Sequence, residues 1–296
     1  TPPVDRKQLE RELKGKGASE VIHLVAKKSI EDVFLLDVEN IIKDLGLSKN
    51  LARLGEVSRV EYNRTLKRAS DDKPTPLTME RLNELAANAA GGAFNDPLLS
   101  DQWHLVNNGN LRPTKFIKGA DVNVEKAWDL TTGDPSIIVA VLDEGVDVSH
   151  PDLKESMWVN EGEIWKSTED NDGNGYIGDV HGYNFVGKHG VISTDSKYDT
   201  GHGTHVAGVI AAANGNGLGI SSIAGGNGSL PGVKIMSCQI FSGVYAGTVL
   251  EEVRAIKYAA DNGAVILQCS WGYISGAANP MEWTPQYSTD EEWETY

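Results

Sequence analysis

At 296 residues, of which 40% are hydrophobic, the chain is long enough for one large globular domain or two smaller ones with a sizeable core. No stretch approaches the roughly 18 consecutive apolar residues of a membrane-spanning helix, which excludes a membrane span. The net charge of −15, from 27 basic and 42 acidic residues, argues against a nucleic acid or an anionic membrane as partner and is compatible with a soluble, exported or cation-binding protein.

Two features of the chain bear on its cellular location. Cys238 and Cys269 each lie inside a strongly apolar segment, which favours buried free thiols over a disulfide framework. No signal peptide begins the chain, but it starts at Thr1 and not at a methionine, which indicates a trimmed or processed product. Export therefore stays open.

A small unit is predicted near the N-terminus. Residues 21–25 have the pattern of a strand, and residues 57–62 have the pattern of a second one. Between them, Ser29 is placed to cap a helix that ends near Gly46. The apolar set of that helix is Val33, Phe34, Val38, Ile41 and Ile42. Strand, helix and strand in about fifty residues make a small core, which we expect to lean on something larger.

A larger domain is predicted after a linker. Residues 69–94 mix charges, prolines and an Ala/Gly-rich end, as exposed linkers do. From residue 95 onward strands alternate with helices, which predicts an α/β domain with a mostly parallel sheet in three layers. The predicted strands are 137–142, 233–241 and 264–269, and the predicted helices are 203–213 and 247–262.

One acid stands at the end of the first strand of this domain. Residues 137–142 form an apolar run typical of a strand buried on both faces of a parallel sheet, and Asp143 follows directly. Reactive groups of open α/β sheets gather outside the carboxyl ends of the strands, so Asp143 has the position of a functional acid. A helix N-cap or a turn is the alternative role.

Two histidines follow at the start of a predicted helix. His202 lies 59 residues after Asp143 (202 − 143), in the run 199–208. The positive end of a helix dipole disfavours a protonated imidazole, which suits a general base. The small residues of the run let the helix approach the sheet, so that His202 would reach Asp143, which would fix its tautomer. For His205 we prefer a packing role. The small residues are Gly201, Gly203, Ala207 and Gly208.

These two runs resemble the Asp and His motifs of the subtilisin-like serine proteases, the subtilases. The resemblance implies a three-layer subtilisin-like fold in which Asp143 orients the base, His202 is the general base and His205 is a buried neighbour. Glu144 departs from the Ser or Thr common after the acid, which should alter local hydrogen bonding but not the role of Asp143.

The segment Ser270-Trp271-Gly272 resembles the Ser-Leu-Gly segment of the family, whose backbone pairs with an extended polypeptide substrate. Trp271 in place of Leu is a departure. In such pairing, main-chain hydrogen bonds hold the peptide while pockets read alternate side chains. Residues 242–244 are a weaker match to the opposite side of the substrate groove.

An Asp/Asn/Gly-rich loop places side-chain oxygens at alternating positions, like the first half of an EF-hand loop. His181 occupies the position of the EF-hand's final Glu, so the loop must close differently. Oxygen ligands favour calcium over zinc or copper, and an Asx-rich surface turn is the alternative. The predicted ligands are Asp170, Asp172, Asn174, Tyr176 and Asp179. Many subtilases have such a structural calcium loop, and Asp152 with residues 214–220 resembles part of a second family site.

The resemblance also implies a role for the N-terminal region. Residues 1–68 resemble a small α+β propeptide, which would assist folding and inhibit the protease through its trailing segment, with processing in the linker 69–94. A generic accessory domain remains the alternative. On this interpretation the peptidase domain is residues 95–296, and the protein is secreted or at the cell surface.

The nucleophile of the family is not found in this sequence. Its serine lies in a Gly-Thr-Ser-Met-Ala-like motif, and no such motif occurs here; Ser221, Ser222, Ser229 and Ser275 lack that context. We therefore expect an incomplete catalytic domain, inactive alone, whose partners are its propeptide and the missing C-terminal part. The alternatives are a catalytically inactive calcium-dependent binding module and a metallohydrolase with Asp143, His202 and His205 as ligands.

Overall fold

The computed structural model divides the chain into two compact units, residues 1–64 with 274–296 and residues 65–273. The residues that it describes are 20–25, 32–37, 66–68, 78, 80, 94–109, 117–194, 199–243 and 245–273.

In the first unit the structure describes two antiparallel strands, β1 (Glu20–Val25) and β2 (Asp32–Asp37). The strand predicted at 21–25 is confirmed. The helix predicted after Ser29 is wrong over residues 32–37, because a short apolar run fits a strand as well as a helix and here pairs with β1 along its whole length. The predicted strand 57–62 lies outside the described residues.

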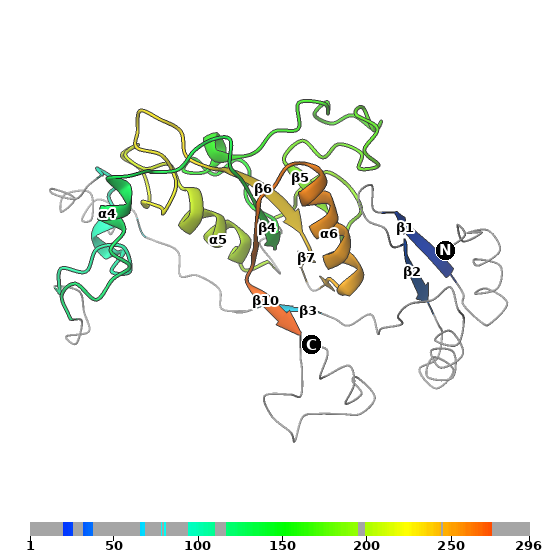
Figure 1. Ribbon diagram of the computed structural model, residues 1–296, viewed down its shortest axis with the longest axis horizontal. Coiled ribbons are helices and arrows are strands. Elements are labelled where there is room, and N and C mark those ends of the chain that lie inside the picture. The colour runs from blue at the N-terminus through cyan, green and yellow to red at the C-terminus, as the bar shows by residue number, and fades with distance from the viewer. Residues whose placement is uncertain are drawn as a thin grey trace, which may run out of the picture. The chain divides into compact units, whose positions relative to one another are not determined.

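The second unit is built on a four-stranded parallel sheet with the order β5-β6-β4-β9 (Figure 1). The central strand β4 (Ile138–Asp143) is the predicted apolar run, and Asp143 is its last residue. It pairs with β6 (Lys234–Gln239) on one side and β9 (Ile266–Cys269) on the other. β5 (Gly182–Asn184) pairs with β6.

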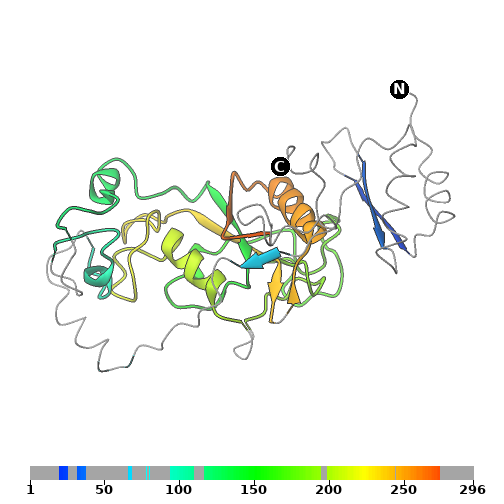
Figure 2. The ribbon, with the colours of Figure 1, turned by 90° about the horizontal axis from the view of Figure 1, so that it is seen from below.

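Helices cover both faces of this sheet, α5 (His202–Ala211) on one and α6 (Val249–Asp261) on the other (Figure 2). Because successive strand residues point to opposite faces, β4 divides between two apolar clusters. Ala140 and Leu142 pack in the cluster of α6, whereas Val139 and Val141 pack in the cluster of α5. The predicted three-layer α/β architecture is confirmed, and the same alternation turns Asp143 toward the face of α5.

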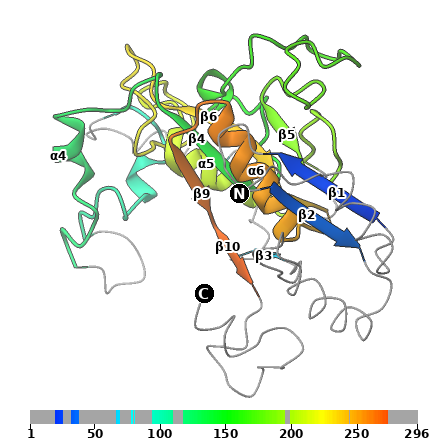
Figure 3. The same ribbon diagram turned by 45° about the vertical axis from the view of Figure 1, so that its right-hand side comes forward.

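Two short strand pairs flank the carboxyl ends of the sheet. β9 continues into β10 (Trp271–Tyr273), which pairs antiparallel with β3 (Leu66–Arg68) (Figure 3). β7 (Phe241–Ser242) and β8 (Tyr245–Ala246) form a second antiparallel pair directly after β6. Segments far apart in the sequence therefore meet where Asp143 ends its strand.

The remaining described helices are short. They are η1 (Leu99–Asp101), α4 (Val124–Trp128) and η2 (Lys154–Ser156). The first two surround a small apolar cluster of Leu99, Leu105 and Val124. In the described part of the chain, no helix combines the length and apolar character needed to cross a membrane.

Both cysteines are free thiols, as predicted, but only Cys238 is buried. Cys238 lies in β6, inside the sheet, and burial raises the pKa of its thiol. Cys269 is exposed, contrary to the prediction, because among the described strands β9 lies at the edge of the sheet.

The approach of α5 to β4 is testable at one glycine. A β-carbon on Gly203 would lie 2.2 Å from the backbone oxygen of Glu144, whereas one on Gly208 would lie 3.4 Å from a side-chain atom of Ile220. We expect Gly203→Ala to lower the free energy of unfolding by about 1–3 kcal/mol through overpacking. Gly208→Ala, the matched control, should be neutral or stabilising by up to about 1 kcal/mol, because alanine favours helix. Urea unfolding measures both, and equal stability of the two variants would contradict this packing.

Candidate active site

Asp143 and His202 form a hydrogen-bonded pair at the carboxyl end of the sheet. The Nδ1 atom of His202 lies 2.8 Å and 2.9 Å from the two carboxylate oxygens of Asp143. Asp143 is 1% exposed and the His202 side chain is 15% exposed, so the ring faces outward from a buried acid. With Nδ1–H donating to the carboxylate, Nε2 is left as a proton acceptor toward the surface. This is the arrangement of an oriented general base.

Local sequence explains why His202 stands where it does. Gly201 precedes the helix in the left-handed conformation, with φ of 80°, which glycine adopts without strain. His202 is then the first residue of α5, and Gly203 and Ala207 let the helix lie against the sheet. The predicted close approach is thereby confirmed, whereas His205, expected to be buried, is exposed on α5.

Burial sets the electrostatics of the acid. It raises the pKa of the Asp143 carboxyl to about 6, against the opposing effects of the hydrogen bond from His202, the charge of His202 and the charge of Arg68. The backbone N–H of Glu144 also donates to Asp143 at 2.7 Å. The carboxyl is therefore ionised at neutral pH and protonated in mild acid.

Glu144, directly after Asp143, has contacts that the sequence did not suggest. It is 0% exposed, and its carboxylate accepts the backbone N–H groups of Thr200 and His202 at 3.0 Å. The Thr200 hydroxyl donates to it at 3.2 Å, and the guanidinium of Arg68 forms an ion pair with it. A carboxylate at the start of a helix is stabilised by the free N–H groups there.

A peptide segment lies on the predicted substrate-binding strand. Trp271 pairs with Arg68 and Gly272 pairs with Lys67, in the antiparallel sense. On the other side, the Leu66 N–H donates to the backbone oxygen of Gly247 at 2.8 Å. β3 thus lies between two backbone partners.

β10 is itself anchored to β4. The indole N–H of Trp271 donates to the backbone oxygen of Leu142 at 2.7 Å, one residue before Asp143. Ser270, the first residue of the predicted segment, precedes β10 and accepts a hydrogen bond from the Gln268 side chain. The departure from Leu to Trp therefore adds a hydrogen bond that leucine would not make.

Two of the serines that lack the family motif have other partners. The hydroxyl of Ser221 donates to Asp96 and that of Ser222 donates to the backbone oxygen of Ala212. Within the described ranges, no serine hydroxyl is hydrogen-bonded to His202. Ser275 lies outside those ranges.

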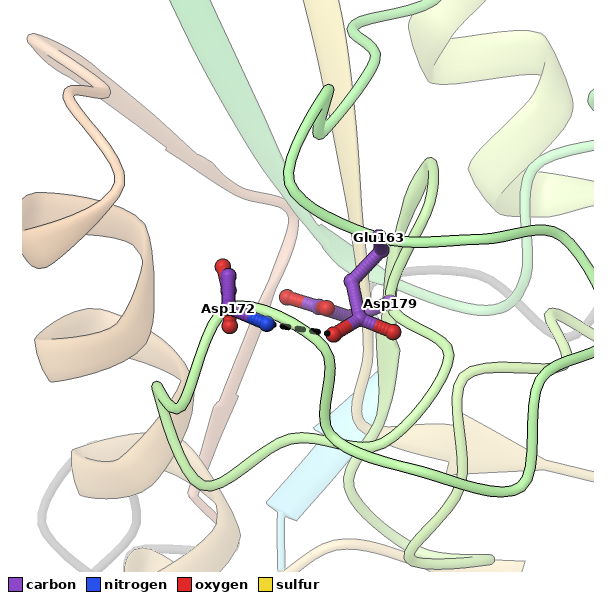
Figure 4. Close-up of side chains that lie close together, drawn as sticks. All are labelled: Glu163, Asp172 and Asp179. Carbon is purple, nitrogen blue, oxygen red and sulfur yellow. Dashed lines mark hydrogen bonds between the residues drawn. The ribbon is translucent and has the colours of Figure 1, made fainter.

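The acidic loop brings three carboxylates together. Glu163, Asp172 and Asp179 have oxygen atoms within 4.8 Å of one another (Figure 4). Glu163 accepts the backbone N–H of Asp172, and Asp179, 0% exposed, accepts the Tyr258 hydroxyl at 2.6 Å. Burial, the largest effect, raises the pKa of Asp179. Glu163 was not predicted, because it precedes the loop and no local spacing marks it.

The other predicted loop residues take different positions. The amide of Asn174 donates to Asp172 at 3.0 Å and to Asp179 at 3.1 Å, so this residue borders the three carboxylates. Asp170 instead accepts the backbone N–H groups of its own turn, at residues 173–175. The ring of Tyr176 packs against Tyr258 and Tyr183 and not toward the three carboxylates.

The second predicted loop is held by carboxylates as well. Asp152 accepts the Asn216 amide at 2.7 Å and the Ile220 N–H at 3.0 Å. Asp96 accepts the backbone N–H groups of Gly215 and Asn216. Asp152 and residues 214–220 are therefore adjacent, as their resemblance implied.

Comparison with known proteins gives three informative matches. The model of the Subtilase family matches residues 134–293. The chain is 30% identical to Subtilisin-like protease 1 of Plasmodium vivax over 211 residues, which are 69% of this chain and 30% of that protein. It is 33% identical to Cell wall-associated protease of Bacillus subtilis (strain 168) over 180 residues, 60% of this chain and 16% of that protein.

A solved structure extends the comparison to the fold. The crystal structure of fervidolysin from Fervidobacterium pennivorans, described as a keratinolytic enzyme related to subtilisin, has a TM-score of 0.56 at 23% identity and covers 91% of this chain and 35% of that chain. The likeness shows a shared fold, which confirms the predicted architecture. The chain matches less than a third of the length of each of the two relatives.

The raised pKa of Asp143 can be measured directly. Carbon-13 NMR should show its carboxyl titrating near pH 6, protonated below and ionised above, whereas ordinary aspartates titrate near 4. Arg68→Gln should move that midpoint upward, because the charge of Arg68 lowers the pKa. Asp143→Asn identifies the signal by removing it. A midpoint at or below about 4 would contradict burial as the dominant effect.

Proposed function

The chain belongs to the subtilase family, and from this premise we propose that it is part of a serine endopeptidase that hydrolyses peptide bonds through an Asp-His-Ser triad. The observation that carries the proposal is the hydrogen bond from His202 to the buried carboxylate of Asp143 at the carboxyl end of β4.

Each residue has a chemical task in this proposal. His202 takes the proton of a serine hydroxyl through Nε2 as that oxygen attacks the peptide carbonyl, and returns the proton to the leaving amine. Asp143 holds the imidazole and stabilises its protonated form. The serine comes from a segment outside these 296 residues, so this chain alone is inactive. The substrate is a polypeptide that adds a strand to β10, along Ser270, Trp271 and Gly272.

Residues 1–68 act as the propeptide in this proposal, and residues 69–94 are the linker that is processed, ahead of the peptidase domain at 95–296. Support comes from β3, the trailing segment of the first region, which pairs with β10 and donates to Gly247 as a bound peptide would. An uncleaved N-terminal region therefore competes with substrate, which makes the protein a zymogen.

We assign a structural calcium ion to the acidic loop. The donor set is composed of oxygen atoms, which calcium prefers, and three carboxylates this close repel one another unless a cation lies between them. Glu163, Asp172 and Asp179 would hold the ion, joined by Asn174 after rotation of its amide. Two further residues complete the proposed set. Asp170 would hold the turn in shape by accepting its backbone N–H groups, and Tyr176 would offer its main-chain carbonyl oxygen. The ion would stabilise the loop and take no part in catalysis.

We place the protein outside the cell or at its surface. Support comes from the relative whose name describes it as cell wall-associated and from the proposed calcium loop. The net charge of −15 argues against a nucleic acid as partner.

Fluorophosphonate labelling of the complete protein tests the proposed activity. We expect one labelled serine that follows residue 296 in sequence, peptide hydrolysis, and a loss of kcat of at least about 10⁴-fold in His202→Ala. His189→Ala, in which an exposed imidazole is removed, is the matched control. Absence of both labelling and hydrolysis in a protein that still binds peptide would favour an inactive binding module. Activity that resists fluorophosphonate but needs a bound transition metal would favour a metallohydrolase.

Calcium titration tests the metal site. Because the ion binds the folded state, saturating calcium at about 100 times the Kd should add about 2.7 kcal/mol to the free energy of unfolding. We expect Asp179→Asn to lose most of this increment, whereas Asp134→Asn, which removes an exposed carboxylate in a local turn, should keep it. Urea unfolding with calcium and with a chelator gives the increment for each variant. Equal increments in the two variants would refute the assignment.

A further inference from the structure

The contact between Arg68 and Glu144 has the geometry of a side chain in a specificity pocket. Arg68 is on β3, which is held on β10 by backbone pairing, and its guanidinium reaches the carboxylate of Glu144. That carboxylate belongs to the residue directly after the catalytic acid. A peptide strand on β10 therefore presents a side chain to Glu144 at one defined register position, opposite Trp271.

Hydrogen bonds from neutral donors hold the carboxylate of Glu144 in a position where it can bind a cation. It is 0% exposed, and the Thr200 N–H, the Thr200 hydroxyl and the His202 N–H all donate to it. These donors lie at the start of α5, so they hold the carboxylate in one position and favour its charged form. They are all neutral, and Glu144 keeps a net negative charge that a cationic side chain would complement.

The position two residues before Arg68 on β3 has apolar surroundings. Side chains two residues apart on a strand share a face, so Leu66 and Arg68 face the same way. Leu66 is 2% exposed and lies in the apolar cluster of α6, which includes Phe241. A peptide on β10 thus places one side chain in an apolar cluster and, two residues further along, a second side chain against an anionic carboxylate.

We propose that Glu144 is a specificity-determining residue, which selects polypeptide substrates with Arg or Lys opposite Trp271 and an aliphatic residue two positions earlier. Arg68 and Leu66 occupy these two positions as substrate side chains do. The inference rests on the proposed endopeptidase function and adds to it the class of peptide that is cut.

Matched peptides test this selectivity on the complete, processed protein. The parent is a quenched fluorescent peptide with the sequence of residues 65–72, Thr-Leu-Lys-Arg-Ala-Ser-Asp-Asp. One analogue has glutamine at the position of Arg68, and a control analogue has glutamine at the position of Lys67, which removes the same charge from the opposite face of the strand.

We expect the first analogue to lose roughly 10- to 100-fold in kcat/KM, the range of a charge-assisted hydrogen bond to a buried group, and the control analogue to lose less than about 3-fold. In Glu144→Gln the Arg/Gln ratio should fall to within about 3-fold, because the charge is gone while the shape is kept. A peptide with Glu at that position should be the poorest substrate of the unaltered protein and should improve relative to the parent in Glu144→Lys.

The two proposals fail in different ways. Equal kcat/KM for the parent and the first analogue in the unaltered protein would overturn the role of Glu144 and leave the endopeptidase function intact. Absence of hydrolysis of every peptide, with no fluorophosphonate label, would overturn the function itself. The comparison within the unaltered protein needs no variant, so poor folding of a Glu144 variant does not obscure the result.

Discussion

The hydrogen bond between Asp143 and His202 depends on how closely α5 approaches the end of β4. Gly203 lies so near the backbone of Glu144 that a β-carbon would clash, and Ala207 is fully buried in the same contact. The alternation of β4 turns Asp143 toward this helix, whose first residue is His202. The tight packing of α5 on β4 therefore also sets the distance between His202 and Asp143. Overpacking at this contact would move His202 relative to the carboxylate.

Two adjacent carboxylates at the end of β4 differ in their electrostatics because they have separate neighbours. Asp143 faces His202 and has a pKa raised by burial, whereas Glu144 receives the N–H groups at the start of α5 and the guanidinium of Arg68. The N-terminus of α5 therefore has two effects. It carries His202, and its N–H groups offset part of the charge of Glu144. The charge of Arg68 also lowers the pKa of Asp143, so a cation beside Glu144 favours the ionised form of Asp143.

Local sequence predicted the parts of the site that lie within single runs. The apolar run before Asp143 and the small residues around His202 each fix one element, so the contact between these two residues was predicted. β2 was missed because its apolar run suits either a helix or a strand until its pairing with β1 is known. The ion pair of Glu144 and Arg68 joins residues 76 apart, and Glu163 precedes the loop that it joins, so neither had a local signal. Such contacts follow from the fold and not from spacing.

Alkylation by a peptidyl chloromethyl ketone most directly tests the central claim, that a peptide on β10 delivers its reactive carbonyl to the imidazole held by Asp143. Such a reagent binds as a substrate does and then modifies the nearest nucleophile, and mass spectrometry of the complete protein locates the adduct. The account predicts a single adduct on His202, at Nε2, with activity lost in proportion to labelling. Loss of activity with the adduct on another residue, or full labelling of His202 with activity retained, would contradict it.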